Sequence, residues 1–85
     1  MSKDILKPIV QEVEYGTIIV HLDKLMKNKN ATNYVLNTNT NIRFQTIQSL
    51  RDNTATRIDF KVLAKLCYSL NCNVADIIEY VPNKK

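Results

Sequence analysis

Residues 32–53 have the sequence TNYVLNTNTNIRFQTIQSLRDN, and this stretch decides how the chain folds. It contains two short apolar patterns at helical spacing, one that includes Leu36 and one that carries Ile47 and Leu50, three residues apart on a single face. A turn between two such helices needs one residue with a positive φ angle, and asparagine tolerates that angle best after glycine. Asn41 stands at this place. The stretch therefore predicts two short helices that cross steeply and share a core.

The ends of these two helices are also predicted by residue type. Thr32 is expected to cap the first helix, because its hydroxyl can accept a hydrogen bond from an exposed backbone N–H. Residues 37–41, Asn-Thr-Asn-Thr-Asn, have low helix propensity, so this helix must be short and held by tertiary contacts. The second helix is predicted over about residues 43–52. Phe44, three residues before Ile47, belongs either to the core or to the exposed face.

Helical spacing of apolar residues predicts three more helices outside this stretch. One begins near His21 and ends near residues 28–30. Another is capped by Asp59, and a last short one is capped by Asn73. The helix after Asp59 is expected to bury a broad apolar face formed by Phe60, Leu63, Ala64, Leu66, Cys67 and Leu70.

The two ends of the chain complete the predicted organisation. Residues 17–20 and 78–81 are short apolar or β-branched runs that can pair antiparallel and cover the edges of the core, although two strands alone are marginal. The expected fold class is all-α, a compact bundle of about five short helices with this two-stranded pairing added. The expected parts are an N-terminal arm over residues 1–16, a domain over 17–81 and a basic tail over 82–85.

Composition limits the classes of protein that the chain can belong to. Its 85 residues allow one domain with a modest core, and 45% of them are apolar, which is typical of a globular domain rather than a disordered tail. No apolar run approaches the roughly 18 residues of a membrane span. The first residues, Met-Ser-Lys-Asp, lack the apolar core of a signal peptide, so we expect a cytoplasmic protein. The net charge of +4 is compatible with a polyanionic partner without requiring one.

Residues that carry chemistry are few. Cys67 and Cys72 are expected to be buried free thiols, because zinc would need two more ligands near them and His21 is far away in sequence. With one His and one Gly, the sequence offers no nucleophile–base pattern and no glycine loop that would cradle a phosphate. We therefore expect no enzyme activity, no metal, no cofactor and no small-molecule ligand.

The chain resembles the Cro-like family of phage-repressor helix-turn-helix regulators, also called XRE-type, especially its small stand-alone members. The resemblance covers about residues 18–81. It is carried by Ile-Arg-Phe-Gln-Thr-Ile at 42–47, Leu-Ala-Lys-Leu-Cys at 63–67, Leu-Asn-Cys at 70–72 and Asp-Ile-Ile-Glu-Tyr at 76–80. The chain departs from the family pattern at three positions, with asparagine in place of the usual glycine at Asn41, asparagine in place of a small residue at Asn37, and no charge at Val35.

The resemblance implies that residues 43–52 lie in the DNA major groove as a recognition helix. By their position in the motif, the residues assigned to DNA are Thr32, Asn33, Arg43, Phe44, Gln45, Thr46, Gln48, Ser49, Asn53, Thr54, Thr56 and Arg57. Those on the recognition helix would face base edges, and those before and after it would bind backbone phosphates. Gln45 suits adenine, Arg43 suits guanine or phosphate, and Phe44 suits a thymine methyl group.

The resemblance thus implies a sequence-specific regulator of transcription that binds double-stranded DNA. We expect a repressor and a homodimer on a pseudo-palindromic operator, with residues 1–15 and 77–81 as candidate dimer surfaces. Two alternatives remain open. The polar residues of 43–52 can form an ordinary solvated helix face, and the fold can serve as a protein-interaction module, such as an antitoxin-like partner. The second alternative is favoured by the modest charge and by the lack of basic residues in the first motif helix.

Overall fold

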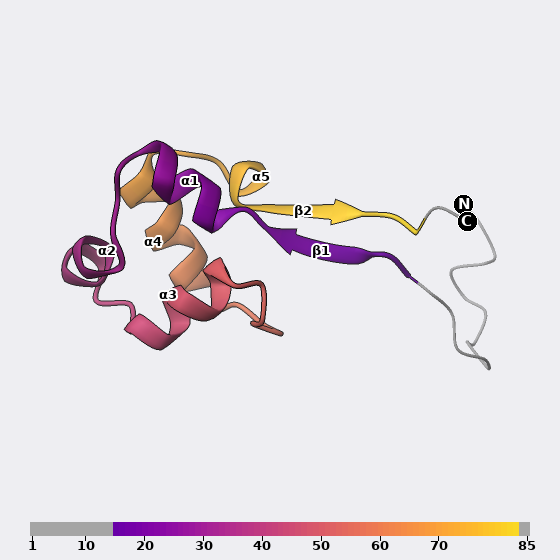
Figure 1. The fold of residues 1–85 in the computed structure, drawn as a ribbon, viewed down its shortest axis with the longest axis horizontal. Helices are drawn as coiled ribbons and strands as arrows, with labels where there is room; N and C mark the ends of the chain where they lie inside the picture. Colours follow the sequence, from indigo (N-terminus) through magenta and orange to yellow (C-terminus); the bar gives the residue numbers. More distant parts are fainter. Residues whose placement is uncertain (1–14, 84–85) are drawn as a thin grey trace.

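The computed structural model describes residues 15–83, and within this range the chain forms five helices and two strands (Figure 1). In chain order they are β1 (Thr17–Val20), α1 (Leu22–Asn28), α2 (Asn33–Thr40), α3 (Phe44–Arg51), α4 (Phe60–Leu70), α5 (Val74–Ile77) and β2 (Ile78–Val81). The expected fold class is confirmed, including the two-stranded pairing. Residues 1–14 of the predicted arm and 84–85 of the predicted tail lie outside the described residues.

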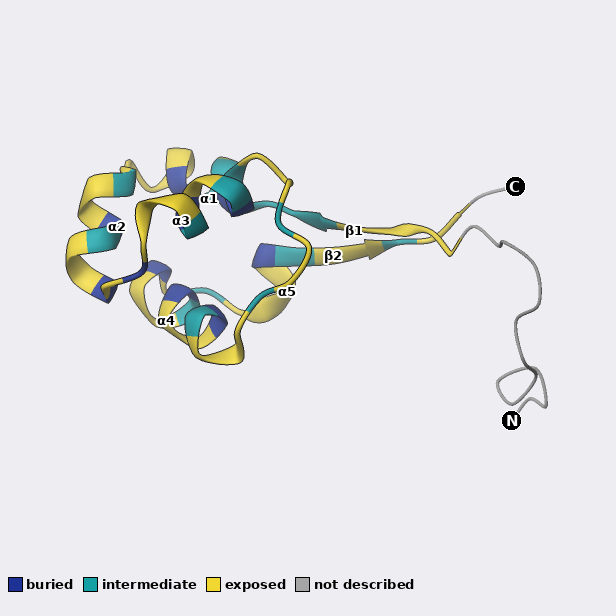
Figure 2. Cartoon of the chain, turned by 90° about the horizontal axis from the view of Figure 1, so that it is seen from below, coloured by how far each residue is buried: buried dark blue, intermediate teal, exposed yellow. Residues whose placement is uncertain are grey.

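The core gathers apolar side chains from all five helices and from the turn between α2 and α3. Its buried members are Leu22, Met26, Leu36, Ile42, Ile47, Leu50, Leu63, Leu66, Leu70 and Ile77. On each helix these residues fall on one face, and the buried segments of α2, α3 and α4 are interrupted by exposed ones in step with the helical turn (Figure 2). Full burial of one such side chain contributes about 1.5–3 kcal/mol, so a small core of this kind can hold the bundle.

The first four helices end at or just before an asparagine with a positive φ. These asparagines are Asn30, Asn41, Asn53 and Asn71, with φ between 52° and 62°. The left-handed residue after a helix is usually glycine, but this chain has one glycine in total. Asparagine replaces it, because its short polar side chain forms local hydrogen bonds in that conformation. The positive φ predicted for Asn41 is confirmed, and the other three positions follow the same rule.

Side-chain hydrogen bonds explain how α2 forms from an Asn/Thr-rich run of low helix propensity. The Thr40 side chain is buried, donates to the carbonyl of Leu36 at 2.7 Å and accepts from the N–H of Ile42 at 3.1 Å. The amide of Asn37 donates to the carbonyl of Ile42 at 2.7 Å. From α4, the ammonium of Lys65 donates to the carbonyl of Thr40 at 2.9 Å. These bonds fasten the end of α2 to the turn and to α4.

The predicted N-caps are present. The hydroxyl of Thr32 accepts from the N–H of Val35 at 3.1 Å, and the carboxylate of Asp59 accepts from the N–H of Lys61 at 2.8 Å. At α5 a capping box forms around Asn73. Each cap satisfies a backbone donor that has no partner inside its helix.

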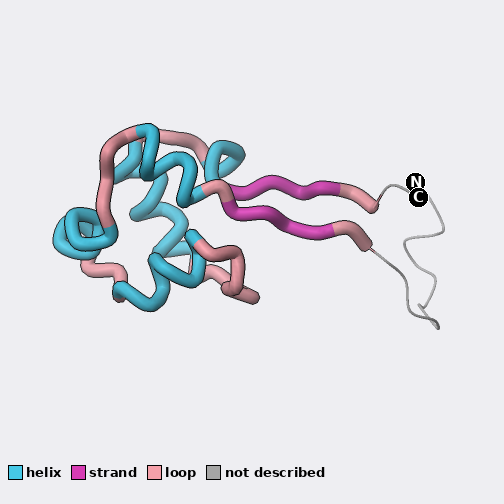
Figure 3. Tube along the Cα trace, in the orientation of Figure 1, coloured by secondary structure: helices cyan, strands magenta, loops and turns pink. Residues whose placement is uncertain are grey.

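The strands form an antiparallel ribbon that extends away from the helical body (Figures 1 and 3). Its register runs from the pair Val20–Ile78 at the body to the pair Thr17–Val81 at the far end. Only the pair at the base packs against the core. The pairing predicted for residues 17–20 and 78–81 is therefore confirmed, but the expectation that it covers the edges of the core is wrong beyond that base.

The far end of the ribbon depends on the glycine that precedes it. Gly16 has φ 93°, and a Cβ added there would lie 2.4 Å from the carbonyl oxygen of Val81. No other residue fits so close to the facing strand. Along the ribbon the side chains of Ile18 and Tyr80 are 56% and 57% exposed, so this element presents apolar surface to solvent.

The apolar face predicted for α4 is narrower than expected. Its buried residues are Leu63, Leu66 and Leu70, whereas Phe60 is 85% exposed and Ala64 is also exposed. Phe60 is the first residue of the helix, three residues before the buried Leu63, and at this end of the helix the rest of the bundle leaves it uncovered. Its predicted place in the core is wrong.

Replacing Asn41 by alanine should destabilise the fold, because a residue with a Cβ and no polar side chain adopts the left-handed conformation at a cost of about 1–2 kcal/mol. We expect Asn41→Ala to lower the free energy of unfolding by about 1 kcal/mol, and Asn41→Gly to change it by less than about 0.5 kcal/mol. Urea denaturation followed by circular dichroism measures both. Asn39→Ala is the matched control, since Asn39 is exposed within α2. Equal losses at residues 39 and 41 would contradict this role.

Candidate nucleic-acid interface

The helix α3 is held by its inner face and exposes its outer one. Ile47 and Leu50 are 0% and 2% exposed and belong to the core. Phe44, Gln45 and Gln48 lie on the opposite side and are exposed. Phe44, which the sequence assigned either to the core or to the surface, is 47% exposed and therefore belongs to the outer face. The outer face of α3 is thus polar apart from one aromatic ring at its start.

Positive charge gathers beside the beginning of α3. Arg43 is the N-cap residue, with an extended backbone and an exposed side chain. Arg43, Arg57 and Lys65 line one groove of about 390 Å³, which Asp59 lines as well. This arrangement of three cations with one carboxylate favours an anion near the N-terminal end of α3.

Two further residues predicted to bind DNA lie at the margin of the outer face. Thr46 and Ser49 are half-buried, and the hydroxyl of Ser49 donates to the carbonyl of Thr46 at 3.1 Å. A hydroxyl bound to its own helix keeps its acceptor lone pairs. Ser49 is therefore accessible mainly as an acceptor.

The first turn of α2 offers backbone donors. The N–H groups of Asn33 and Tyr34 have no carbonyl partner within a helix that begins at Asn33, while Thr32 already caps the N–H of Val35. Tyr34 is 68% exposed, so this turn faces solvent. Free N–H groups and the positive end of the helix dipole together suit a phosphate.

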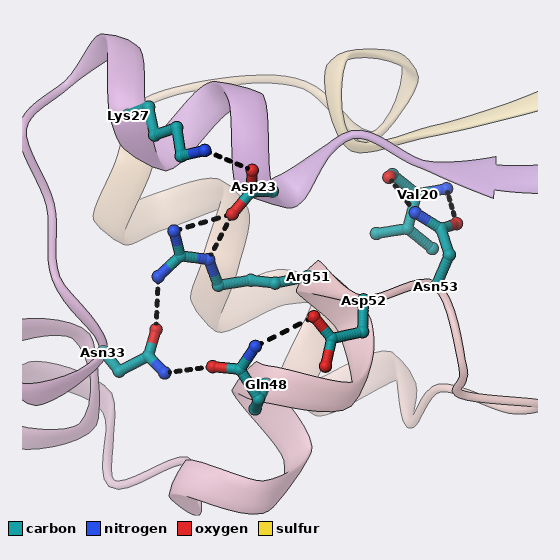
Figure 4. Close-up of polar contacts among 8 residues, drawn as sticks. All are labelled: Val20, Asp23, Lys27, Asn33, Gln48, Arg51, Asp52 and Asn53. Carbon is teal, nitrogen blue, oxygen red and sulfur yellow. Dashed lines mark hydrogen bonds and ion pairs between the residues drawn. The ribbon is translucent and has the colours of Figure 1, made fainter.

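A chain of polar contacts joins α1, α2 and α3 (Figure 4). The guanidinium of Arg51 binds Asp23 through Nε at 2.7 Å and Nη2 at 2.6 Å. Its third nitrogen, Nη1, donates to Oδ1 of Asn33 at 2.6 Å. Asn33 Nδ2 then donates to Oε1 of Gln48 at 2.8 Å, and Gln48 Nε2 donates to Asp52 at 2.9 Å. Two residues predicted to bind DNA, one on α2 and one on α3, are thereby linked directly.

Asn53 is turned toward the ribbon. Its Oδ1 accepts from the N–H of Val20 at 2.7 Å, and its Nδ2 donates to the carbonyl of Val20 at 2.9 Å (Figure 4). The side-chain amide thus binds the edge of β1 as a neighbouring strand would. It fastens the base of the ribbon to the residue that follows α3, and its predicted contact with a phosphate stays a prediction.

The remaining residues predicted after α3 lie in the loop before α4. Thr54, Thr56 and Arg57 are all exposed. The hydroxyl of Thr54 reaches the carbonyl of Ser49 at 3.4 Å, and the backbone N–H of Thr54 donates to the same oxygen at 2.9 Å. This loop therefore begins by closing the C-terminal end of α3. Its Ala55 and Ile58 pack against the core, whereas Thr56 and Arg57 are open to solvent.

Sequence reasoning missed two residues that organise this surface. Arg51 is one of the polar residues of 43–52 for which a solvated face is an alternative, yet its side chain is only 17% exposed, and the sequence predicts no role for Asp23. They are 28 residues apart and meet only because α1 packs against α3. Nothing in the local pattern of either segment indicates this contact, so the sequence alone could not have found it.

The charge on Asp23 is stabilised by two cations. Hydrogen bonds from Lys27, at 3.0 Å, and from Arg51 hold the pKa of the Asp23 carboxyl below its ordinary value of 3.8. The carboxylate is therefore ionised at neutral pH and keeps its hold on the guanidinium.

The cysteines are free thiols, as expected, but both are half-buried rather than buried. Burial, followed by the neighbouring Cys67, raises the pKa of the Cys72 thiol above its ordinary value of 9.0. A protonated thiol is a weak nucleophile and a weak metal ligand. Among residues 15–83, no three or more His, Cys, Asp or Glu side chains are placed to hold a metal ion together. In the same range, no helix has the length and apolar character needed to span a membrane.

A known family resembles this chain in sequence, and a known protein resembles it in structure. The model of a family described as the Cro/C1-type HTH DNA-binding domain matches residues 21–83. The structure is similar to the crystal structure of the transcriptional regulator VanUg, Form II, with a TM-score of 0.64 and 19% sequence identity. That similarity covers 89% of this chain and 100% of the other, and at this identity it shows the fold alone. No curated protein matches the sequence.

The ionised Asp23 should stabilise the fold in a pH-dependent way. Because its pKa is lower in the folded than in the unfolded chain, its contribution is fully present above pH 3.8 and is lost as the pH falls through the lower, folded value. We expect Asp23→Asn to have a lower urea midpoint than the wild type at pH 6, and the two midpoints to converge as the pH is lowered below 3.8. The two urea midpoints should already be closer at about one pH unit below the unfolded pKa. A gap between them that is as wide there as at pH 6 would contradict this role of Asp23.

Proposed function

Because the chain belongs to the Cro/C1-type helix-turn-helix DNA-binding family, we propose that it regulates transcription by reading double-stranded DNA in the major groove with α3. One observation carries the proposal. Ile47 and Leu50 fix α3 by its inner face, while Gln45 and Gln48 stand exposed on the outer one. A short helix fixed in this way presents the same side chains to every DNA site that it meets.

The residues at the start of α3 have the chemistry for base recognition. Gln45 can donate and accept at once, which suits the N6 and N7 atoms of adenine. Arg43 suits guanine or a phosphate, and the exposed ring of Phe44 suits a thymine methyl group. Thr46, Gln48 and Ser49 follow on the same helix; they would act as secondary contacts, because two are half-buried and Gln48 is already bound to Asn33.

Phosphate binding would fix the register of α3 on the duplex. Thr32 and Asn33 stand at the first turn of α2, whose open N–H groups favour an anion. After α3, the exposed Thr56 and Arg57 are the clearest candidates, with Thr54 beside them. Asn53 would contribute the second hydrogen of its NH₂ group, since its oxygen and the first hydrogen are bonded to Val20.

A single helix of this length gives little specificity, so we propose a homodimer on a pseudo-palindromic operator, with the two copies of α3 about 34 Å apart. The ribbon is the candidate dimer surface among the described residues, since Ile18 and Tyr80 are exposed on it. We further propose that the protein acts in the cytoplasm as a repressor, by occupying its operator. The exposed outer face of α3 supports operator binding, and the exposed Ile18 and Tyr80 support the dimer.

Protein binding is a second candidate function, favoured by one observation on α4. Phe60, at the start of α4, and Tyr68, near its end, are 85% and 89% exposed. Large aromatic side chains of this kind are common at protein interfaces. This surface lies on a different helix from the outer face of α3, so the two functions are separable by mutation.

Replacing Gln45 by alanine should weaken binding to the selected operator by about 1–3 kcal/mol and leave binding to unrelated DNA nearly unchanged, because the variant loses base contacts and no charge. Fluorescence anisotropy with both DNAs measures the two affinities. Asn39→Ala is the control, since it removes an exposed amide of the same chemistry from the last turn of α2. Equal losses on both DNAs would count against base recognition.

The salt dependence of DNA affinity separates the two candidate functions. Each phosphate contact should lower log affinity by about 0.9 per unit of log salt concentration, so the proposed set of phosphate contacts predicts a steep slope. A flat response, or no binding to any duplex, would favour the protein-binding function of α4. If α4 binds a protein, Tyr68→Ala should weaken the affinity for that protein partner. If α3 binds DNA, the same change should leave the DNA affinity unchanged.

A further inference from the structure

In the chain of polar contacts from Arg51 to Asp52, every hydrogen bond is donated by the residue nearer to Arg51 and accepted by the next one. Arg51 can only donate hydrogen bonds and Asp52 can only accept them, and the amides of Asn33 and Gln48 lie between these two ends. An amide can bind in either of two orientations, but here a donor at one end and an acceptor at the other permit only one. The oxygen of each amide therefore faces Arg51, and the nitrogen of each faces Asp52 (Figure 4).

This direction decides what Asn33 can offer to a ligand. Its oxygen is taken by the guanidinium of Arg51 at 2.6 Å, and one hydrogen of its NH₂ group is taken by Gln48 at 2.8 Å. The NH₂ group keeps one further hydrogen. A phosphate oxygen can only accept, so an Asn33 held in this orientation meets it with a donor, whereas the reversed amide would meet it with an oxygen.

The orientation depends in turn on Asp23. Its carboxylate binds two nitrogens of Arg51, Nε and Nη2, so the third nitrogen, Nη1, is aimed at Asn33. The Arg51 side chain is 17% exposed and the Asp23 side chain 39% exposed, so the guanidinium itself is largely removed from water and has few alternative partners. The planar, forked guanidinium is what allows bonds in two fixed directions; an ammonium group at the same place would lack that geometry.

We propose that Asp23 and Arg51 are positioning residues for DNA recognition, which bind no DNA themselves and set the amide orientation of Asn33 and, through it, of Gln48. The ion pair on the protein side of α3 thus determines that the first turn of α2 presents a side-chain donor to a backbone phosphate. This inference rests on the proposed function, since it gives a role to residues behind that surface. Asp23 and Arg51 thereby affect DNA affinity although neither belongs to the outer face of α3.

A double-mutant cycle tests this assignment. Arg51→Lys keeps the charge and the pairing with Asp23 but loses the fixed bond to Asn33, so we expect it to weaken operator binding roughly threefold to tenfold, the effect of one hydrogen bond. In an Asn33→Ala background the same change should weaken binding by less than about twofold, because the amide through which Arg51 acts is absent. Anisotropy at one fixed salt concentration gives all four affinities.

A spectroscopic measurement keeps the test independent of DNA binding. In the free protein, Arg51→Lys should shift the side-chain NH₂ resonances of Asn33 and Gln48 in a ¹⁵N correlation spectrum while the backbone resonances of α4 stay in place. Asp23→Asn, a second variant, should move the same two signals. Lys27→Gln is the matched control: it removes the other partner of Asp23 and leaves Arg51 intact, so the two NH₂ signals should not move.

The outcomes distinguish this inference from the function on which it rests. If the wild type shows no salt-dependent DNA binding, the proposed function and this inference both fail. If the wild type binds but the losses from Arg51→Lys and Asn33→Ala multiply in the double variant, or the NH₂ signals do not respond to Arg51→Lys, the proposed function survives and the positioning role is overturned.

Discussion

The burial of Ile47 and Leu50 on one face of a two-turn helix is the constraint on which the rest of the structure depends. With those two side chains in the core, α3 cannot rotate about its axis, and its polar residues must face outward. Neither the propensity of so short a helix nor its exposed residues would hold it in that position. The surface that we propose for DNA is therefore a consequence of packing on the opposite side of the same helix.

Polar side chains complete what the core begins. The core sets which face of each helix is buried, but the ends of the helices and the turns between them are fixed by asparagine, threonine and arginine. Asn41 ends α2 with a left-handed residue, Thr40 and Asn37 fasten the following turn, and Arg51 joins α3 to two other helices. In a small domain with a modest core, such contacts hold the helix ends and turns in one conformation. Each of them satisfies a backbone or side-chain group that would otherwise lack a partner.

Features that depend on neighbours in sequence were predictable, and those that depend on distant contacts were not. The cap at Thr32, the left-handed Asn41 and the buried stripe of α3 follow from residue type and helical spacing. The pairing of Asp23 with Arg51 joins segments 28 residues apart, and no local pattern marks it. The direction of the ribbon and the exposure of Phe60 likewise depend on where the bundle ends, which periodicity does not report.

The central claim is that the outer face of α3 and the first turn of α2 meet DNA together. The most direct test is a titration of ¹⁵N-labelled protein with a duplex selected from random DNA, followed by backbone amide resonances. The account predicts the largest shifts at Gln45, Gln48 and Asn33, with α4 nearly unchanged. Shifts concentrated on the outer side of α4 around Phe60 and Tyr68, with α3 unaffected, would contradict it.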